Sequence, residues 1–523
     1  MDAKQISQVR ELLGDCLYEI EDYNIKTLPL YREIYERVIL PSKNTMTFSS
    51  ALVVILCEFS RILNYYKFTI NLDFEPNKPL VPMNMYGFNI LKSGGGKGLT
   101  TGCINNLLNF DYQKEQYLLE LQRIQSNYFE TKEEKKDFDG VINKLNILNG
   151  AEEMASATTA GLRNYYKMIN DCFDFMNLNK DERFGSMFFN ISEFADILQN
   201  ASAIDNDFLS TLKEMYDLGK FSAKSKGEDL KPAMDIFISM LCATTDKTLQ
   251  EDSKVSKAFN SYLISGNARR CLLAFPSDEE MQEVLERQKV TDGLSLDELF
   301  EAMRYKETPQ DVELRKKVQN LVSKACYLFK THKNQMRVTF EGQKHYFFYK
   351  LLCAERAKGV KSSILEVEIL NRYWKALKVA GLLAFFDNSL EINEKYIKEG
   401  IRIVEFFSFH LKRLLNNRVL DVADKIVELL LDARGTAISR RELSQNNEIL
   451  SFNKTNMSGS DFIDKNIVAV NETLDTTDYQ LIVKNLGKTK PNYYYAICPD
   501  SWSNPDINPK TLKVFDNVPK GDK

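Results

Sequence analysis

The chain has 523 residues, of which 44% are hydrophobic and 27% are charged, a composition typical of a folded globular protein and not of a disordered chain or a fibre. Lysine and arginine number 69 against 73 aspartate and glutamate residues. The resulting net charge of -4 excludes binding to nucleic acid through bulk positive charge, so any such binding must be local. Nine cysteines without a C-x-x-C pair and only three histidines give no ligand spacing for a structural zinc, which indicates reduced, buried thiols.

No segment of the sequence predicts a membrane span or a signal peptide. The N-terminus places Asp2 and Lys4 on a helical pattern and lacks a basic segment followed by an apolar core. The longest apolar run, Ala51 to Cys57, is far shorter than a membrane span and ends at Glu58. We therefore expect a soluble, cytoplasmic protein with no membrane contact.

The first part of the chain is expected to be helical and then to turn into strands. Helical periodicity from Ile6 to about Tyr66 predicts an all-helical N-terminal region, residues 1–70. Phe68–Leu72 alternates as a strand or hairpin arm does, and a proline-rich connector leads to a predicted strand at Tyr86–Leu91. Helical periodicity returns at Leu99–Phe110. The sequence therefore predicts a strand–loop–helix unit around residue 95.

The loop of this unit is rich in glycine around one lysine. Backbone N–H groups of such a turn converge at the start of the helix, where the helix dipole also favours an anion. We predict a phosphate-binding loop for ATP, made of Ser93, Gly94, Gly95, Gly96, Lys97, Gly98 and Leu99. Against the pattern G-x-x-x-x-G-K-[ST], Leu91 replaces the first glycine and Gly98 replaces the Mg²⁺-binding hydroxyl. A flexible turn beside a lysine is the alternative interpretation.

Two later apolar runs end in residues that an ATPase needs. Ser186–Ile191 is followed by Glu193, and a carboxylate at the end of a buried strand can polarise the attacking water or hold Mg²⁺. Alone, Glu193 would more often be a solvated residue after a core strand, and the glycine-rich loop reverses that preference. The strand Ile236–Thr245 ends in Thr244 and Thr245, hydroxyls of the type that senses a γ-phosphate.

Two arginines, Arg269 and Arg270, directly precede the predicted strand Cys271–Pro276. A guanidinium at a subunit edge can stabilise charge on a neighbour's phosphate, so the pair is a candidate arginine finger; the alternative is a structural pair bonded to carboxylates. The order of the strands predicts a mostly parallel α/β ATPase core, the P-loop NTPase fold, over residues 71–277.

A basic loop with an aromatic residue precedes the threonine strand. Its lysines, Lys220, Lys224 and Lys226, are candidate DNA contacts that would follow a backbone while Phe221 stacks on a base. A polar surface loop is an equally good interpretation of the same residues.

The remainder of the chain is predicted to form a helical domain and a smaller mixed one. Residues 278–420 are expected to be a helical, lid-like domain that includes the packed helices Trp374–Phe385 and Ile401–Leu415.

Residues 421–498 combine helices with alternating segments at Ile467–Val470 and Tyr479–Lys484, which is typical of a winged helix. Binding of DNA and binding of a partner protein are equally compatible with its near-balanced charge. Residues 499–523, rich in asparagine, aspartate, proline and lysine, are expected to be a flexible tail.

Together these motifs resemble a family of helicase-like P-loop ATPases of phages and mobile elements, with a core like that of RecA and AAA+ proteins. Many members are known only as a domain of unknown function, and the family is related to replicative helicases and to the helicase halves of primase–helicases. The resemblance covers about residues 45 to 415 and rests on Phe48–Leu63, Ser93–Lys97, Ala157–Leu162, Ile191–Phe194, Ser265–Arg270, Trp374–Phe385 and Ile401–Phe407.

The resemblance implies ATP hydrolysis with Mg²⁺ at the subunit interfaces of a homo-oligomeric ring, expected to be a hexamer, that moves along single-stranded DNA. Such a protein would act in the bacterial host cytoplasm if a phage encodes it, and its C-terminal domain would bind replication proteins such as a primase or polymerase. The sequence contains no zinc-binding primase module, so a complete primase–helicase is not expected.

The resemblance also implies a role for each site residue. Lys97 would hold the β- and γ-phosphates and Glu193 would activate the attacking water. Thr244 or Thr245 would sense the γ-phosphate. Arg269 or Arg270 would act in trans, on the phosphate bound by a neighbouring subunit.

The metal site departs from the family pattern. Because Gly98 has no side chain to ligate Mg²⁺, Thr100, Thr101 or Ser192 would have to replace the missing hydroxyl, directly or through water. This departure keeps a second hypothesis open, a nucleotide-gated interaction protein with weak turnover, such as a helicase loader, a remodeller or a defence ATPase.

Overall fold

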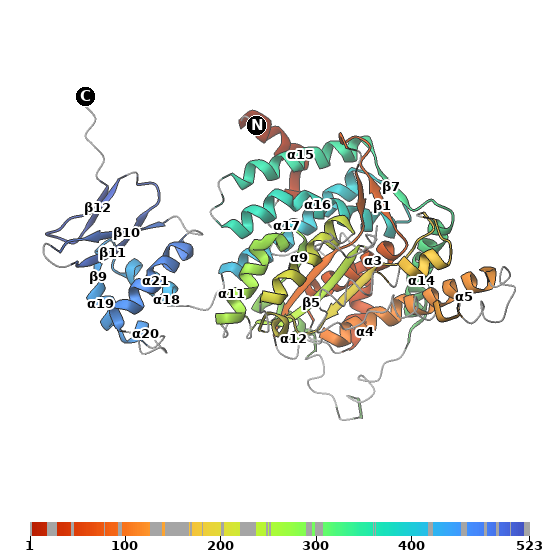
Figure 1. Cartoon of the computed structure of the whole chain (residues 1–523), viewed down its shortest axis with the longest axis horizontal. Helices are drawn as coiled ribbons and strands as arrows, with labels where there is room; N and C mark the ends of the chain where they lie inside the picture. The colour runs from red at the N-terminus through yellow and green to blue at the C-terminus, as the bar shows by residue number, and fades with distance from the viewer. Residues whose placement is uncertain are drawn as a thin grey trace. The chain divides into compact units, whose positions relative to one another are not determined.

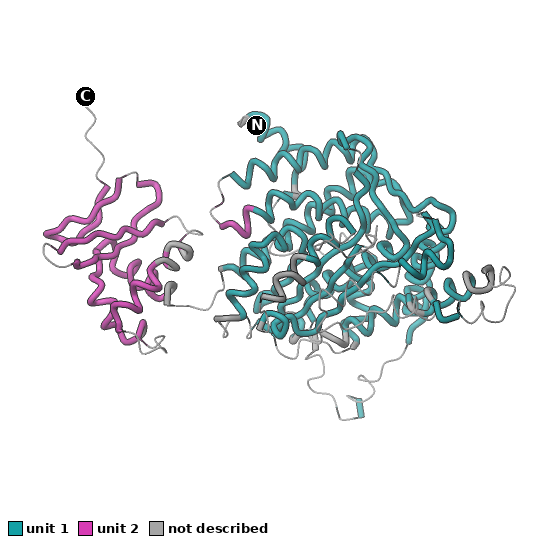
Figure 2. The backbone as a smooth tube through the Cα atoms, viewed as in Figure 1, with its two compact units in different colours: residues 1–358, 367–415 teal, residues 359–366, 416–523 magenta. Residues whose placement is uncertain are grey.

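The computed structural model describes most of the chain, in segments. These are residues 3–17, 29–42, 46–77, 79–92, 97–125, 137, 139–141, 167, 170–179, 181–199, 203–219, 237–246, 249, 253–288, 295, 297–298, 307–358, 360, 362–416, 422–450, 458–474, 479–487, 491–502 and 504–516. The chain divides into two compact units, residues 1–358 with 367–415, and residues 359–366 with 416–523 (Figure 2). The predicted N-terminal region, ATPase core and helical domain therefore belong to one unit and are not separate bodies.

A four-stranded sheet is at the centre of the first unit. Its strands are β4 (Met187–Ile191), β5 (Ile238–Thr245), β3 (Tyr86–Leu91) and β6 (Cys271–Ala274), in that order and all parallel. Nearly every residue in them is buried, as expected for a parallel sheet covered on both faces. The prediction of an α/β core with a mostly parallel sheet is confirmed, and the predicted strands lie within two residues of the observed ones.

One face of this sheet is covered by α3 (Phe48–Tyr65), which contacts all four strands. Gly87 of β3 allows the close approach, since a Cβ there would lie 2.5 Å from both Cys57 Sγ and Val53 Cγ1 of the helix. Asn89 Nδ2 donates to the carbonyl of Ser50 at 3.2 Å. The expectation of a separate N-terminal helical region is wrong for this helix, because its apolar residues face the sheet and form an inner layer of the core.

In the part of the chain that the structure describes, α3 is the one helix long and apolar enough to cross a membrane. All of its residues are buried inside the first unit. Its hydrophobicity is therefore accounted for by its place against the sheet.

The other face of the sheet is covered by α8 (Phe194–Gln199), α9 (Ala203–Leu218) and α11 (Ser253–Tyr262) (Figure 1). Phe88 of β3 meets Phe194 edge-on with ring centroids 4.9 Å apart, and the Tyr86 hydroxyl donates to the Leu212 carbonyl at 2.8 Å. The side chains of β3 thus alternate between α3 and this second layer, as the period of a strand requires.

Further elements enclose the core of the first unit. They are α1 (Ala3–Leu13), α2 (Pro29–Ile34), α4 (Lys97–Leu108), α5 (Phe110–Gln125), α12 (Asp278–Gln288), α14 (Pro309–Lys330), α15 (Phe340–Ala357), α16 (Ser363–Phe386) and α17 (Glu394–Asn416). The predicted helices Trp374–Phe385 and Ile401–Leu415 are confirmed within α16 and α17.

A second sheet joins the predicted helical domain to the core. Its order is β2 (Leu80–Pro82), β1 (Thr69–Asn71), β7 (Gln335–Val338) and β8 (Glu391–Ile392). β1 pairs in parallel with β7, far away in sequence, and antiparallel with β2. Because strands from both regions share this sheet, residues 278–415 do not form an independent lid-like domain.

The second unit has its own core of helices and strands. Its elements are α18 (Val422–Asp432), β9 (Ile438–Ser439), α19 (Arg440–Gln445), α20 (Asn447–Leu450), α21 (Gly459–Leu474), β10 (Tyr479–Asn485), β11 (Tyr493–Pro499), β12 (Pro505–Ile507) and β13 (Val514–Asp516). Strands β10, β11 and β9 form an antiparallel sheet in that order. The predicted strand at Tyr479–Lys484 is confirmed.

Two expectations for this unit are wrong. Ile467–Val470 lies inside α21, where Ile463, Val470 and Leu474 are buried in the unit's core at helical spacing. Residues 505–516 of the predicted flexible tail form the hairpin β12–β13, and Ile507 is buried against Ala437 and Ala496. The hairpin is held by this apolar contact, which the polar composition of the segment conceals.

The described cysteines are free thiols, as the sequence predicts. Burial raises the pKa of Cys57 and Cys242 well above that of an exposed thiol, which makes these two side chains unreactive core residues.

Candidate functional site

The candidate site lies at the edge where the parallel strands end. Leu91, the last residue of β3, is level with Thr245, and Ile90 is level with Thr244. β4 ends at Ile191, so Ser192 and Glu193 follow at the same edge. The carboxyl ends of parallel strands are where ligands bind in open α/β sheets.

Two predicted site residues are in direct contact at this edge. The Thr244 hydroxyl donates to Glu193 Oε1 at 2.7 Å. Thr244 is fully buried and Glu193 is partly exposed. A short hydrogen bond from a buried hydroxyl to a carboxylate is charge-assisted and fixes the carboxylate orientation. The chain thus holds an acid in a defined position beside the end of β3.

The chain leaves β3 and β5 on opposite faces of the sheet. β3 leads into α4, which packs on α3 and α14. The helices that follow β4 and β5, α8 and α11, pack together on the other face. Adjacent strands whose connections diverge in this way form a topological switch point, and the crevice between their carboxyl ends is the usual ligand site.

The glycine-rich loop joins β3 to α4 at this crevice. Ser93, Gly94, Gly95 and Gly96 lie outside the described residues. Lys97, Gly98 and Leu99 form the first turn of α4, a helix of 12 residues. Because β3 ends at Leu91, the N-terminus of α4 is a few residues from the strand edge, and its dipole favours an anion there.

The candidate metal ligands differ in accessibility. Thr100 is fully buried in the first turn of α4 and Thr101 is 7% exposed, whereas Ser192 is exposed beside Glu193. Among the described residues, no group of three or more His, Cys, Asp or Glu side chains is arranged to hold a metal. Ser192 fits a direct ligand better than Thr100 does.

An ion pair that the sequence did not suggest flanks the same edge. Lys92, directly after β3, pairs with Asp278 at 2.6 Å, and Asp278 opens α12 just beyond β6. The hydrogen bond with Asp278 raises the pKa of Lys92, and the charge of Asp246, which follows β5, adds to the effect. Charged residues that follow β3, β5 and β6 thus come together at the carboxyl edge of the sheet.

The arginine pair lies at the opposite edge of the sheet. Arg269 and Arg270 precede β6, and Cys271 is level with Tyr86 at the start of β3. Five residue steps along β3 separate that level from Leu91, about 17 Å at roughly 3.3 Å per residue. Within one chain, the pair is therefore distant from the glycine-rich loop.

Both arginines bind one carboxylate, Asp217 of α9. Arg270 Nε donates to Asp217 Oδ1 at 3.1 Å and Arg269 Nη2 to Asp217 Oδ2 at 3.2 Å, and Arg270 Nη2 also pairs with Asp217. The side chain of Arg270 is 4% exposed and that of Arg269 is 38% exposed. In the single chain, Arg270 is therefore a structural residue bonded to a carboxylate, which is the alternative interpretation given for the arginine pair. The role in trans stays a prediction, and it falls to Arg269.

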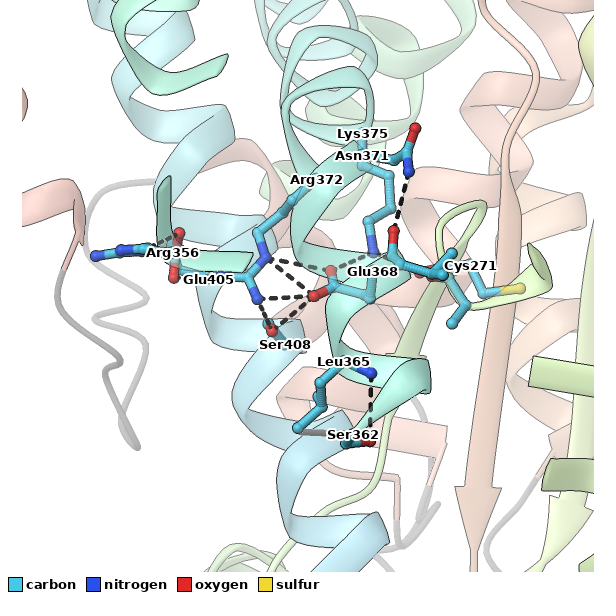
Figure 3. A network of polar contacts seen from close by, with 12 residues as sticks. Cys271, Arg356, Ser362, Leu365, Glu368, Asn371, Arg372, Lys375, Glu405 and Ser408 are labelled. Carbon is cyan, nitrogen blue, oxygen red and sulfur yellow. Dashed lines mark hydrogen bonds and ion pairs between the residues drawn. The ribbon is translucent and has the colours of Figure 1, made fainter. Parts of the chain in front are cut away.

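A buried charge network in α16 and α17 lies beside the turn of residues 268–270, which carries the two arginines and is called the arginine turn below (Figure 3). Lys375 donates to the carbonyls of Cys271 at 3.1 Å and Ala268 at 3.4 Å, and pairs with Glu368 at 2.6 Å. Arg372 bonds both Glu368 and, at 2.6 Å, Glu405. The backbone carbonyls of the first residue of the arginine turn and of the residue directly after it are therefore bonded to Lys375 of α16.

Glu368 is ionised in this network although it is fully buried. Burial alone would raise its pKa, but the charges of Arg372 and Lys375 outweigh burial and lower the pKa to about 2. Charged residues at positions i, i+4 and i+7 of an otherwise apolar helix were the sequence signal for this network, and the predictions did not use it.

The remaining predicted residues are not described. Lys220, Lys224, Lys226 and the segment Ala157–Leu162 lie outside the described residues, so their predicted roles stay predictions.

Neither the family models nor the curated proteins give a relative for this chain. No family model matches it, and no curated protein matches its sequence. The interpretation of the site therefore rests on the chain's own geometry and on the motifs in its sequence.

Proposed function

We propose that the chain is an ATP-hydrolysing P-loop ATPase that works as a DNA helicase or translocase in phage or mobile-element replication, as a ring on single-stranded DNA. The observation that carries the ATPase part is the hydrogen bond between Thr244 and Glu193 beside the strand–loop–helix unit. The order β4-β5-β3-β6 supports it, because the threonine strand lies between the acidic strand and the strand that precedes the glycine-rich loop. The DNA part rests on the sequence resemblance.

Each residue at the edge has a role in this proposal. ATP supplies the phosphoanhydride that is cleaved, and Mg²⁺ neutralises charge on its phosphates. The N-terminus of α4 and Lys97 bind the phosphates. Glu193 orients the attacking water and accepts its proton, and Thr244 keeps the Glu193 carboxylate aimed at the crevice. Ser192 is the proposed metal ligand that replaces the hydroxyl absent at Gly98.

In a ring, Arg269 is the better candidate for the arginine that acts on a neighbouring subunit's phosphate. Its side chain is 38% exposed and has a single bond to Asp217, whereas Arg270 is buried and binds Asp217 through two nitrogens. Arg270 then has the role of holding the turn.

The second unit supports the proposal of a winged helix. The chain order α18, β9, α19, α20, α21, β10, β11, with an antiparallel sheet of β9 to β11, is that of helices followed by a two-stranded wing. We propose that this unit binds DNA or a replication partner.

The test is ATPase activity with and without single-stranded DNA, alongside a mass measurement of the protein with ATP. We expect DNA to stimulate hydrolysis, a ring to form, and Lys97→Ala and Glu193→Gln each to lower kcat at least 100-fold. Glu341→Gln, at an exposed glutamate of α15, is the matched control and should leave kcat unchanged.

A DNA-independent, strictly monomeric protein would contradict the helicase proposal. The second candidate, a nucleotide-gated interaction protein, is favoured by one feature, the glycine that follows Lys97. It predicts partner binding that depends on nucleotide, and fast hydrolysis on single-stranded DNA alone would exclude it.

A further inference from the structure

A cavity of about 320 Å³ lies in the first unit, beside the arginine turn and away from the glycine-rich loop. Its wall comes from the β2 segment, from α9, from the turn before β6 and from α16. The side chains that matter for its chemistry are Asp217, Arg269, Arg270, Trp374 and Lys378. The proposed ATPase function gives roles to Arg269 and Arg270 but to no other residue of this cavity.

Positive charge is in excess around the cavity. Among the described residues that line it, three are basic, the permanently charged Arg269 and Arg270 and the titratable Lys378, and one is acidic, Asp217. Lys213 lies one helical turn before Asp217, and its pKa is lowered by burial and by the charges of Arg270 and Arg269. Burial lowers the pKa of Lys378 to about 7, to which Arg270 also contributes. Burial is the main cause of both shifts and Asp217 opposes them, so the preference for an anion rests on the excess of basic side chains over the single carboxylate.

The cationic side chains are held in place by the fold. Lys378 Nζ donates to Asn84 Oδ1 at 2.6 Å and to the Asn84 carbonyl at 2.9 Å, and lies 4.1 Å from the centroid of the Tyr216 ring. Arg270 Nη1 donates to the Gly266 carbonyl at 2.5 Å in addition to its bonds with Asp217. Arg269 is the more exposed of the two arginines, so it can turn toward a ligand while Arg270 stays fixed.

The remaining wall is mostly apolar, although Asn371 and Tyr216 also line it. Trp374 contributes an indole that contacts Tyr373, with ring centroids 5.3 Å apart, and Pro79, Leu80 and Pro82 add apolar surface. At roughly 30 Å³ of liquid volume per water the cavity has space for about ten waters, so a lone inorganic anion would fill little of it. Its volume is at the lower end of the range for small-molecule sites.

From this combination we propose that the cavity binds a small organic anion, a phosphate or carboxylate joined to one flat ring. The anionic group would bind Arg269 and Lys378, and the ring would stack on Trp374. By strand length, the level of Cys271 is about 17 Å from the end of β3 at Leu91. The inference does not depend on the proposed ATPase function.

The test uses Trp374 as its own reporter. The sequence contains two tryptophans, so Trp502→Phe leaves Trp374 as the single fluorophore of the full chain. Phenyl phosphate and benzoate are the two anionic probes, and inorganic phosphate and phenol lack the ring or the charge. We expect saturable quenching by at least one anionic probe, with Kd at least tenfold higher for phenol and for inorganic phosphate. Which anionic probe binds better distinguishes a phosphate site from a carboxylate site.

Variants separate this site from other binding. Arg269→Gln should raise Kd at least tenfold, whereas Arg315→Gln, an arginine of α14 that is 45% exposed and also paired with a carboxylate, should leave Kd unchanged. Lys97→Ala, at the proposed nucleotide site, should not change Kd either. Quenching that does not saturate, or a Kd that is equal in Arg269→Gln and the parent, would overturn the proposal.

Discussion

Replacing Glu368 by glutamine removes the carboxylate at the centre of the buried network while keeping its shape. In the folded chain the pKa of Glu368 is lowered from 4.5 to about 2, which corresponds to about 3 kcal/mol of stabilisation at neutral pH. Breaking a buried ion pair by removing one partner costs about 3–5 kcal/mol, because the other charge stays buried. We therefore expect Glu368→Gln to lower the free energy of unfolding by about 3 kcal/mol or more at pH 7.

The same reasoning fixes the pH dependence of this effect. Because the folded pKa is below the unfolded pKa, the stabilisation is present above pH 4.5 and is lost as the pH falls toward 2. The difference between wild type and Glu368→Gln should shrink from about 3 kcal/mol at pH 7 to about 2 kcal/mol at pH 3.5.

Urea unfolding followed by Trp374 fluorescence in the Trp502→Phe background is the appropriate assay, because Trp374 reports the first unit alone. Glu341→Gln, at an exposed glutamate of α15 in the same unit, is the matched control and should change stability by less than about 0.5 kcal/mol. Equal effects of the two variants, or a Glu368→Gln effect that is independent of pH, would refute the account of the network.

Three further variants test other parts of the structure. Gly87→Ala should destabilise the first unit by about 1–3 kcal/mol, because its Cβ would clash with α3, whereas Gly102→Ala, with open space around it, should be neutral or stabilising in the same urea assay. Wild-type stability should rise by about 2 kcal/mol between pH 7 and 9, because Lys378, with a pKa of about 7, loses its proton in the folded chain while the unfolded chain still binds it. Lys378→Met should abolish this rise, and a pH profile identical to that of the wild type would contradict the reasoning. Thr244→Val should lower ATPase kcat about tenfold with little change in KM, since it removes the hydroxyl that orients Glu193, and an unchanged kcat would dissociate that bond from turnover.

The strands of the central sheet were predictable because each is a short apolar run bounded by polar or turn residues. β3 and β6 were located from their apolar composition and from the turn-forming residues at their ends, since strands buried on both faces contain few polar residues. The contact between Thr244 and Glu193 was beyond prediction, because it depends on which strands are neighbours. The sequence placed these residues at strand ends, and the order of the sheet brought them together.

The errors have physical causes. The four residues Ile467–Val470 alternate locally, but the longer helical period of α21 decides their conformation. The sequence did not distinguish α3 from a peripheral helix. Its helical periodicity predicts an apolar face but does not identify the surface against which that face packs. Asp217 binds the arginines and Lys378 lines the same cavity. These two residues come from elements far apart in sequence and share no local motif, so the sequence did not suggest them.

The position of α3 also has a consequence for the chain as it emerges from the ribosome. This helix is made before every strand that it covers, and its last contact in the sheet, β6, ends at Ala274. About 200 residues must be added after α3 before β6 is complete, which at 5–20 residues per second takes roughly 10 to 40 s. Until then the 18-residue apolar helix has only part of its native cover, beginning with β3. We expect slow translation between residues 92 and 274 to prolong this exposure and to favour aggregation over folding.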